Sequence, residues 1–509
     1  MTKLSAVAGM TTILLMLTAC TAGPDYQRPA ASVPAAYKEA ANEVANWQVA
    51  RPADAIDPGA WWSVYHDPVL DDLERQIDIS NQTLKAAEAA FRQAEAIVAQ
   101  ARAGFFPTAQ INASATRSRG GGGGGAGASA SGGRGGSGSI SNFFSIAGSA
   151  SWILDLWGKV SRAVEGDIAT AQADAGDVAN ARLAAQGQLA TDYVQLRVAD
   201  ELKRLLEAAV KGYSESLRIS QNQYDAGIAS ASDVAQARTQ LESTKAQAIA
   251  TGVLRAQLEH AIAVLIGKSP AELTIAAVAS VPALPDIPAG LPSTLLERRP
   301  DIAAAERRMA AANAQIGVVE AAFFPEVTLS ASSGSAAATL GKLLSASSRI
   351  WSFGSTLVET VFDAGARHAQ VEEARAQFDA TVADYRQTVL TGFQQVEDEL
   401  AALRILAEQA AAEDIAVTAS REAERIIFNQ YKAGTVAFTA VVVAQTAALT
   451  NAEAALSVRQ SRLVASVALI RALGGGWDAS LVPDREHIES DSPLNFSPLP
   501  PADAWPKLW

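Results

Sequence analysis

Few side chains in this chain could carry out chemistry, and their spacing argues against catalysis. The histidines lie far apart, at His66, His260, His368 and His487. A site of the His-Glu-x-x-His type needs two histidines on one face of one helix, and no Gly-x-Ser-x-Gly nucleophile motif occurs either. The run Glu397-Asp398-Glu399 lies in a helical pattern, where successive charges point in different directions and usually mark a solvated face. We therefore expect no enzyme and no metal site.

Cys20 is the only cysteine, and it directly follows Leu17-Thr18-Ala19. Lys3 supplies a short positive region, and Val7 to Leu17 form an apolar core too short to span a bilayer. This pattern resembles a bacterial lipobox, in which the cysteine becomes the new N-terminus and carries a covalent lipid. The other interpretation is an ordinary secretory signal with an incidental cysteine. Thr21 stands where an aspartate would favour the inner membrane, so we expect the outer membrane.

The composition narrows the class of protein further. The precursor of 509 residues carries a net charge of −13, or −14 once Lys3 leaves with the signal, which argues against a nucleic-acid partner. A single cysteine excludes a disulfide scaffold. After the signal, we expect no apolar run that approaches the roughly 18 to 20 residues of a membrane helix. We therefore expect any membrane crossing to use strands.

The chain repeats itself at a spacing of 207 to 218 residues. Ala103-Gly104-Phe105-Phe106-Pro107 recurs as Ala321-Ala322-Phe323-Phe324-Pro325, and Asn222 to Gly227 recurs as Asn429 to Gly434. Such a period is too long for a solenoid unit and suits a duplicated half. The halves flank a linker containing Pro270, Pro282, Pro285, Pro288 and Pro292, which cannot continue a helix.

In each half the spacing of apolar residues predicts one helix, two strands, a very long helix and a shorter helix, in that order. In the first half the helix is expected over 71–103, the strands over 109–116 and 140–154, and the later helices over 159–225 and 232–266. In the second half the strands are expected over 327–331 and 350–362, and the helices over 366–432 and 438–473. Residues 120–139 are almost all glycine, serine and alanine, which favours a flexible loop at the outer rim over a phosphate-binding loop.

Four strands cannot enclose a pore, because even eight leave room only for side chains or one small ligand. An open sheet in a membrane would leave unpaired edge groups in hydrocarbon. The fold class expected is therefore membrane α+β, and the chain must oligomerise; three copies would give a 12-stranded β-barrel continued by a 12-helix tube. A helix of nearly seventy residues is roughly 100 Å long, and its alanines let neighbours interlock as in coiled coils.

Together these motifs resemble the outer-membrane factor (TolC-like) family, and specifically its lipoprotein branch of the OprM and NodT type. The residues that carry the resemblance are Cys20, Trp61-Trp62, Asp67-Pro68, the two Phe-Phe-Pro turns, Asp155 to Gly158, Tyr224 to Gly227, Arg298 to Ile302, and Ala472 to Trp477. The resemblance implies a trimeric exit duct of a tripartite pump. Its partners would be a periplasmic adaptor protein, an inner-membrane transporter of the resistance-nodulation-division (RND) type and the lipid of the outer membrane.

The resemblance also implies roles for the hairpin turns. The turns Ala226-Gly227 and Ala433-Gly434 would form the tips that meet the adaptor. Relatives have an Asp-Ala-Gln-Arg sequence after the second turn that helps to lock the aperture, whereas this chain reads Val443-Ala444-Gln445-Thr446. The candidate gate is therefore Val441 and Val443, closing by dewetting, with Asp233 as a polar contributor. Alternatively, these valines simply pack between helices.

The expected function is passive conduction of small molecules such as drugs or toxic compounds, and the alternative is the exit duct of a type I protein-secretion system. A non-transporting envelope scaffold remains a third class. These observations divide the chain into a signal peptide (1–19), a lipid-anchored segment (20–60), a first repeat (61–267), a linker (268–296), a second repeat (297–475) and a proline-rich tail (476–509).

Overall fold

The computed structural model describes residues 21–31, 33–34, 36–39, 60–119, 140–285, 287 and 297–489. Three features named above lie outside these residues: Cys20 with the signal, the glycine-rich segment 120–139, and the tail beyond residue 489. The inter-repeat linker is described only in part.

Two helices of 67 residues dominate the molecule: α4 (Lys159–Asp225) and α8 (Ala366–Lys432). Neither contains a proline, so nothing interrupts the hydrogen-bond ladder. Each folds back into a helix of 35 residues, α5 (Ala231–Leu265) or α9 (Phe438–Ala472). In the described part of the chain the other α-helices are α2 (Pro68–Ser80), α3 (Gln82–Arg102), α7 (Pro300–Ala321) and α10 (Arg485–Ile488), and the longest 3-10 helix is η3 (Trp61–Tyr65). The long helices thus confirm the predicted bounds within one residue.

The single helix predicted over 71–103 was wrong, because the structure breaks it at Asn81. The Asn81 side chain caps α3 by accepting a hydrogen bond from Leu84 N at 2.8 Å, and it donates to Leu265 O at 2.7 Å. An asparagine cap competes with helix continuation because its oxygen replaces an intrahelical partner. The first of the two helices, α2, starts earlier than expected, at Pro68 behind the cap Asp67.

The four strands form one antiparallel sheet in the order β1-β2-β3-β4. They are β1 (Thr108–Arg119), β2 (Ile140–Ile153), β3 (Glu326–Ala337) and β4 (Arg349–Val358). The prediction for the last strand ran four residues too far. Glu359, an acidic residue within the predicted strand, lies beyond β4 and pairs with Arg367 at 3.5 Å.

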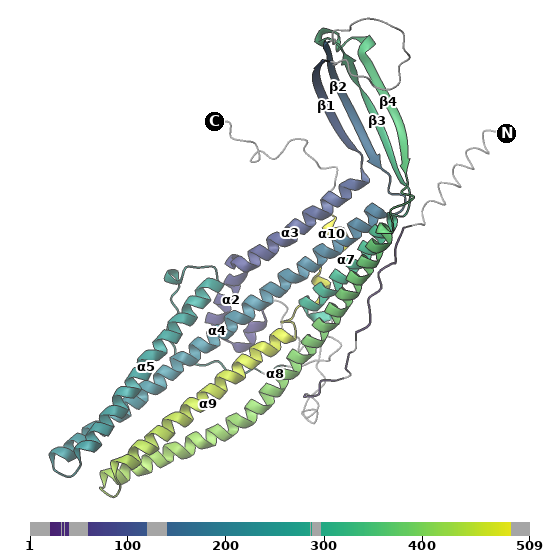
Figure 1. The fold of residues 1–509 in the computed structure, drawn as a ribbon. Coiled ribbons are helices and arrows are strands. Elements are labelled where there is room, and N and C mark those ends of the chain that lie inside the picture. The colour runs from purple at the N-terminus through teal and green to yellow at the C-terminus, as the bar shows by residue number, and fades with distance from the viewer. Residues whose placement is uncertain are drawn as a thin grey trace.

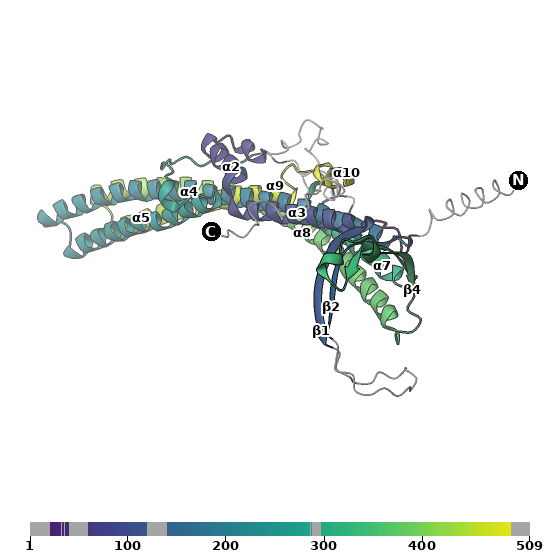
Figure 2. The same ribbon diagram turned by 90° about the horizontal axis from the view of Figure 1, so that it is seen from above.

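The helices lie side by side in one long layer, with the sheet at one end and the two hairpin turns at the other (Figure 1). Near the sheet the order is α3-α4-α7-α8, and near the turns it is α5-α4-α9-α8. The view from above shows α2 and α10 on one side of this layer (Figure 2). The layer is four helices wide along its whole length because α4 and α8 run through both parts.

The main hydrophobic core lies where the two repeats meet. Trp61, Tyr193, Ile302, Tyr385 and Val467 are buried there. The indole of Trp61 donates to Gln186 Oε1 at 3.2 Å, so the polar atom of this large side chain is satisfied.

Among the residues that the structure describes, two helices, α5 and α9, are long and apolar enough to cross a membrane by length and composition alone. This corrects the expectation that no such stretch follows the signal. Each of them packs along a long helix, α5 along α4 and α9 along α8. Their apolar character is therefore explained in part by coiled-coil packing inside the helical layer.

Candidate functional site

The sheet has two chemically different faces. On one face the register places apolar side chains from all four strands, among them Ile111, Ile146, Leu329 and Phe353. Most of them have no cover within the chain, as Ile111 is 83% and Phe353 is 75% exposed. An exposed apolar band that extends across four strands marks a surface that contacts a partner or a membrane.

The opposite face carries mostly hydroxyl and amide groups, with the apolar side chains Phe143, Ile153, Ile350 and Val358 near the strand ends. Pairs of serines hydrogen-bond across neighbouring strands: Ser114 with Ser145 at 2.8 Å, and Ser332 with Ser352 at 2.8 Å. Within the four strands this polar face carries one charged side chain, Glu326, at the start of β3. Alternation of apolar and polar faces is the pattern of a membrane strand whose inner side meets water.

The described N-terminal segment starts at the base of the sheet. Ala22 N donates to Trp157 O at 2.9 Å, and the guanidinium of Arg162 reaches Ala22 O at 3.1 Å and the carboxylate of Asp25 at 2.8 Å. Gly23 has φ 89° and lies against Gly317 of α7. The residue after Cys20 is thus held where the strands join the helices.

From there the described residues of the segment (21–31, 33–34 and 36–39), here called the strap, follow α7 and α8. Tyr26 donates to Glu306 Oε1 at 2.6 Å, and burial raises the pKa of the Tyr26 hydroxyl. Farther along, Lys38 N and Glu39 N donate to the carboxylate of Glu397 at 2.7 and 3.0 Å. Glu397 therefore anchors the strap, which the expectation of a merely solvated charge run did not foresee.

The two hairpin turns have matching geometry. Gly227 has φ 74° and Gly434 has φ 75°, each just after an alanine that ends the long helix. Ile228 N donates back to Gln223 O, and Thr435 N donates back to Gln430 O, as in helices that end on a left-handed glycine. No heavy atom lies within 4 Å of a Cβ added at either glycine, so both turns are open to contact.

The candidate gate residues occupy three different environments. Val441 is 1% exposed and packs in a small core with Tyr431, Phe438 and Ala237. Val443 is 69% exposed. The carboxylate of Asp233 accepts a hydrogen bond from Ser230 N at 3.1 Å as part of the capping box of α5. Within one chain the packing interpretation fits Val441, whereas the side chain of Val443 is open to solvent.

Uncharged hydrogen bonds join the two hairpins near their tips, and the sequence patterns did not reveal them. Gln445 Nε2 donates to Ser216 Oγ at 3.0 Å, and the Tyr213 hydroxyl donates to Gln445 O at 3.2 Å. Ser220 and Tyr431 share a further bond of 3.0 Å. The sequence offered one indication of these bonds: Val443 and Thr446 are uncharged at the positions where the Asp-Ala-Gln-Arg sequence of relatives has an aspartate and an arginine. These bonds connect α4 to α8 and α9 without an ion pair.

Among the described residues no group of three His, Cys, Asp or Glu side chains is arranged to hold a metal ion. The prominent features are instead a two-faced sheet and helices about 100 Å long, at 1.5 Å per residue. A membrane sheet carried on such helices defines a class: this is an outer-membrane channel protein that extends into the periplasm.

Comparison with known proteins agrees with that class. The family model described as outer membrane efflux protein matches residues 74–268 and 291–475. A probable efflux pump outer membrane protein of Pseudomonas putida, TtgC, is 32% identical over 467 residues, which is 91% of this chain and 94% of the relative. The outer membrane protein OprJ of Pseudomonas aeruginosa is 30% identical, over 92% of this chain and 96% of the relative.

Solved structures give the same result. The outer-membrane channel OprN superimposes with a TM-score of 0.82 at 30% identity, covering 90% of this chain and 100% of that one. The open state of the MtrE channel of Neisseria gonorrhoeae gives 0.76 at 27% identity, covering 90% and 99%. The chain therefore belongs to the outer membrane efflux protein family, and its function is efflux across the outer membrane.

Proposed function

We propose that three copies of this chain form the outer-membrane duct of a tripartite efflux system. The observation that carries the proposal is the four-stranded sheet, whose edge strands β1 and β4 each pair on one side only in the described chain. Unpaired edge groups are costly in hydrocarbon. Three copies would close twelve strands into a ring, with the serine-lined face around the lumen.

The helical layer supports the same assembly. Exposed apolar side chains gather on its outermost helices, with Ile249 and Val253 on α5, and Leu390 and Ile415 on α8. Contact between α5 of one copy and α8 of the next uses two different surfaces, and such head-to-tail contacts close into rings. Twelve helices would then continue the lumen through the periplasm.

Native mass spectrometry of the detergent-solubilised full-length protein tests the assembly. We expect three chains, and Ile415→Arg should shift the protein toward monomers. The matched control is Ile79→Arg, because Ile79 on α2 is also 72% exposed but lies away from the layer edges. A wild-type monomer would overturn the proposal.

We infer that Cys20 carries a covalent lipid at the periplasmic level of the outer membrane. The support is the strap, which holds Thr21 beside Gly158 at the base of the sheet. A single acyl chain binds a membrane only weakly, so a lipid on Cys20 would act together with the membrane sheet to attach the chain stably. Mass spectrometry of the N-terminal peptide should find the lipid on Cys20 and none in Cys20→Ser. An unmodified cysteine in the wild type would refute the anchor.

The exposed turns Ala226-Gly227 and Ala433-Gly434 are proposed as the contact surface for a periplasmic adaptor, which would link the duct to an RND-type inner-membrane transporter. Small molecules are the proposed cargo, because the relatives are efflux proteins; the protein-secretion alternative has no such support. A photo-crosslinking residue at Ala226 or Ala433 should capture the adaptor in cells. The control position is Leu340, which is exposed in the connection between β3 and β4. Equal capture at Leu340 would contradict the proposal.

A further inference from the structure

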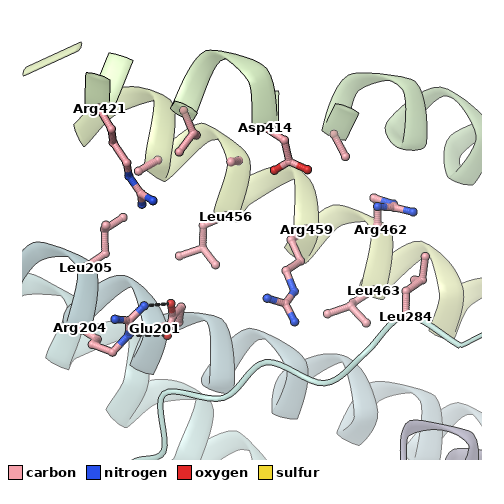
Figure 3. Close-up of a pocket in the computed structure, with 14 residues that line it drawn as sticks. Glu201, Arg204, Leu205, Leu284, Asp414, Arg421, Leu456, Arg459, Arg462 and Leu463 are labelled. Atoms are coloured by element: carbon pink, nitrogen blue, oxygen red, sulfur yellow. Dashed lines mark hydrogen bonds and ion pairs between the residues drawn. The ribbon is translucent and has the colours of Figure 1, made fainter. Parts of the chain in front are cut away.

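A groove of about 490 Å³ lies between the two hairpins, lined by α4, α8 and α9 and crossed by the linker at Leu284 (Figure 3). Four arginines line it: Arg204, Arg421, Arg459 and Arg462. Their side chains come from all three helices, and only two carboxylates, Glu201 and Asp414, share the lining. The groove therefore has an excess of positive charge.

The charges in the groove are only partly neutralised within the chain. Arg204 Nε pairs with Glu201 at 2.9 Å, and Arg459 donates to Val281 O at 2.9 Å. Among the described residues neither Arg421 nor Arg462 forms an ion pair, although the charge of Arg421 opposes the rise that burial causes in the pKa of the nearby Glu424 carboxyl. Arg462 Nε is moreover buried without a hydrogen-bond acceptor, and a buried unpaired donor on a charged group is costly.

We propose that this groove binds a small anion with two or more charged oxygens. The planar fork of a guanidinium matches carboxylate and phosphate oxygens in pairs, and an acceptor beside Arg462 would satisfy its buried nitrogen. The groove volume lies in the range of small-molecule sites, which favours a compact ligand over a protein segment.

A bound anion would connect the two repeats. Arg421 belongs to the second hairpin and faces α4 of the first, and it also lines a smaller cavity of about 230 Å³ that reaches Tyr213 and Gln445. An anion held between these helices would stabilise their present packing close to the hydrogen bonds that join the hairpin tips. Binding itself does not depend on conduction, so its test stands apart from the proposed function.

Isothermal titration calorimetry of the purified full-length protein tests the site, with inorganic pyrophosphate and citrate as separate probes at constant ionic strength. We expect saturable binding of at least one probe, weakened about tenfold or more in Arg462→Gln and in Arg421→Gln, because each loses a charged hydrogen-bond donor. The control Arg218→Gln removes an exposed arginine of α4 that is paired with Glu215 and should bind as the wild type does.

The two probes separate phosphate from carboxylate chemistry. Absence of saturable binding for both probes would overturn the proposal, and so would equal affinity in the wild type and both groove variants. Circular dichroism of each variant establishes that it is folded, and the two arginines lie on different helices, so one unstable variant leaves the other to decide.

Discussion

Replacing Gly23 by alanine should release the strap from the base of the sheet. Gly23 has φ 89°, and a Cβ there would overlap Gly317 Cα and lie 2.8 Å from Gly317 N. An L-residue in the left-handed region costs roughly 1–2 kcal/mol, and overpacking against rigid backbone adds about 1–3 kcal/mol. The total cost of roughly 2–5 kcal/mol opposes the few hydrogen bonds that hold Ala22 and Asp25 in place.

Hydrogen exchange at the Ala22 amide, which donates to Trp157 O, measures this release. At 2 kcal/mol local opening becomes about 30-fold more frequent, because each 1.36 kcal/mol is tenfold. The control is Gly227→Ala, with a similar φ of 74° but no atom within 4 Å of the new Cβ. Gly317→Ala should also raise exchange, since its Cβ would lie 2.8 Å from Ala22 O. Unchanged exchange in Gly23→Ala, or an equal rise in Gly227→Ala, would refute the reasoning.

Two further predictions concern the helices. Burial, and then the negative neighbours Asp78 and Asp71, raise the pKa of Glu74 well above its ordinary 4.5. As pH rises, the Glu74 carboxyl therefore loses its proton in the unfolded state before it does so in the folded state. The free energy of unfolding consequently falls from about pH 4.5 upward. Glu74→Gln should therefore raise the melting temperature more at pH 8 than at pH 4.5. An equal rise in melting temperature at both pH values would contradict this prediction. Val441→Ala should lower stability by about 2 kcal/mol because it empties a buried site, whereas Val443→Ser should leave stability unchanged in thermal melts. Single-channel recordings of Val443→Ser decide its place in the gate, since unchanged closure removes it.

Much of the fold could be predicted because the signals are local and repeated. The long helices follow from a proline-free, alanine-rich sequence such as that between Gly158 and Gly227, and the strands from the alternation that follows each Phe-Phe-Pro turn. The cap that Asn81 forms with Leu84 N is local, but its second bond, to Leu265 O, joins residues 184 apart in the sequence. No local pattern contains such a contact.

The candidate site was predictable only in part for the same reason. The turn glycines were visible because their conformation is a local requirement. The strap was not, since its partners Arg162, Glu306 and Glu397 are distant in sequence. Val441 and Val443 look alike in the sequence, yet tertiary packing buries one and leaves the other exposed.

The most direct test of the account is to determine which face of the sheet lines the path of the conducted ions. Cys20 is the only cysteine, so an acylated chain offers no competing thiol to a membrane-impermeant charged thiol reagent. In planar bilayers, the reagent should lower the single-channel conductance of Ser332→Cys, on the hydroxyl face, and leave that of Phe353→Cys, on the apolar face, unchanged. The reverse pattern, or no conductance steps from the wild type, would contradict the account.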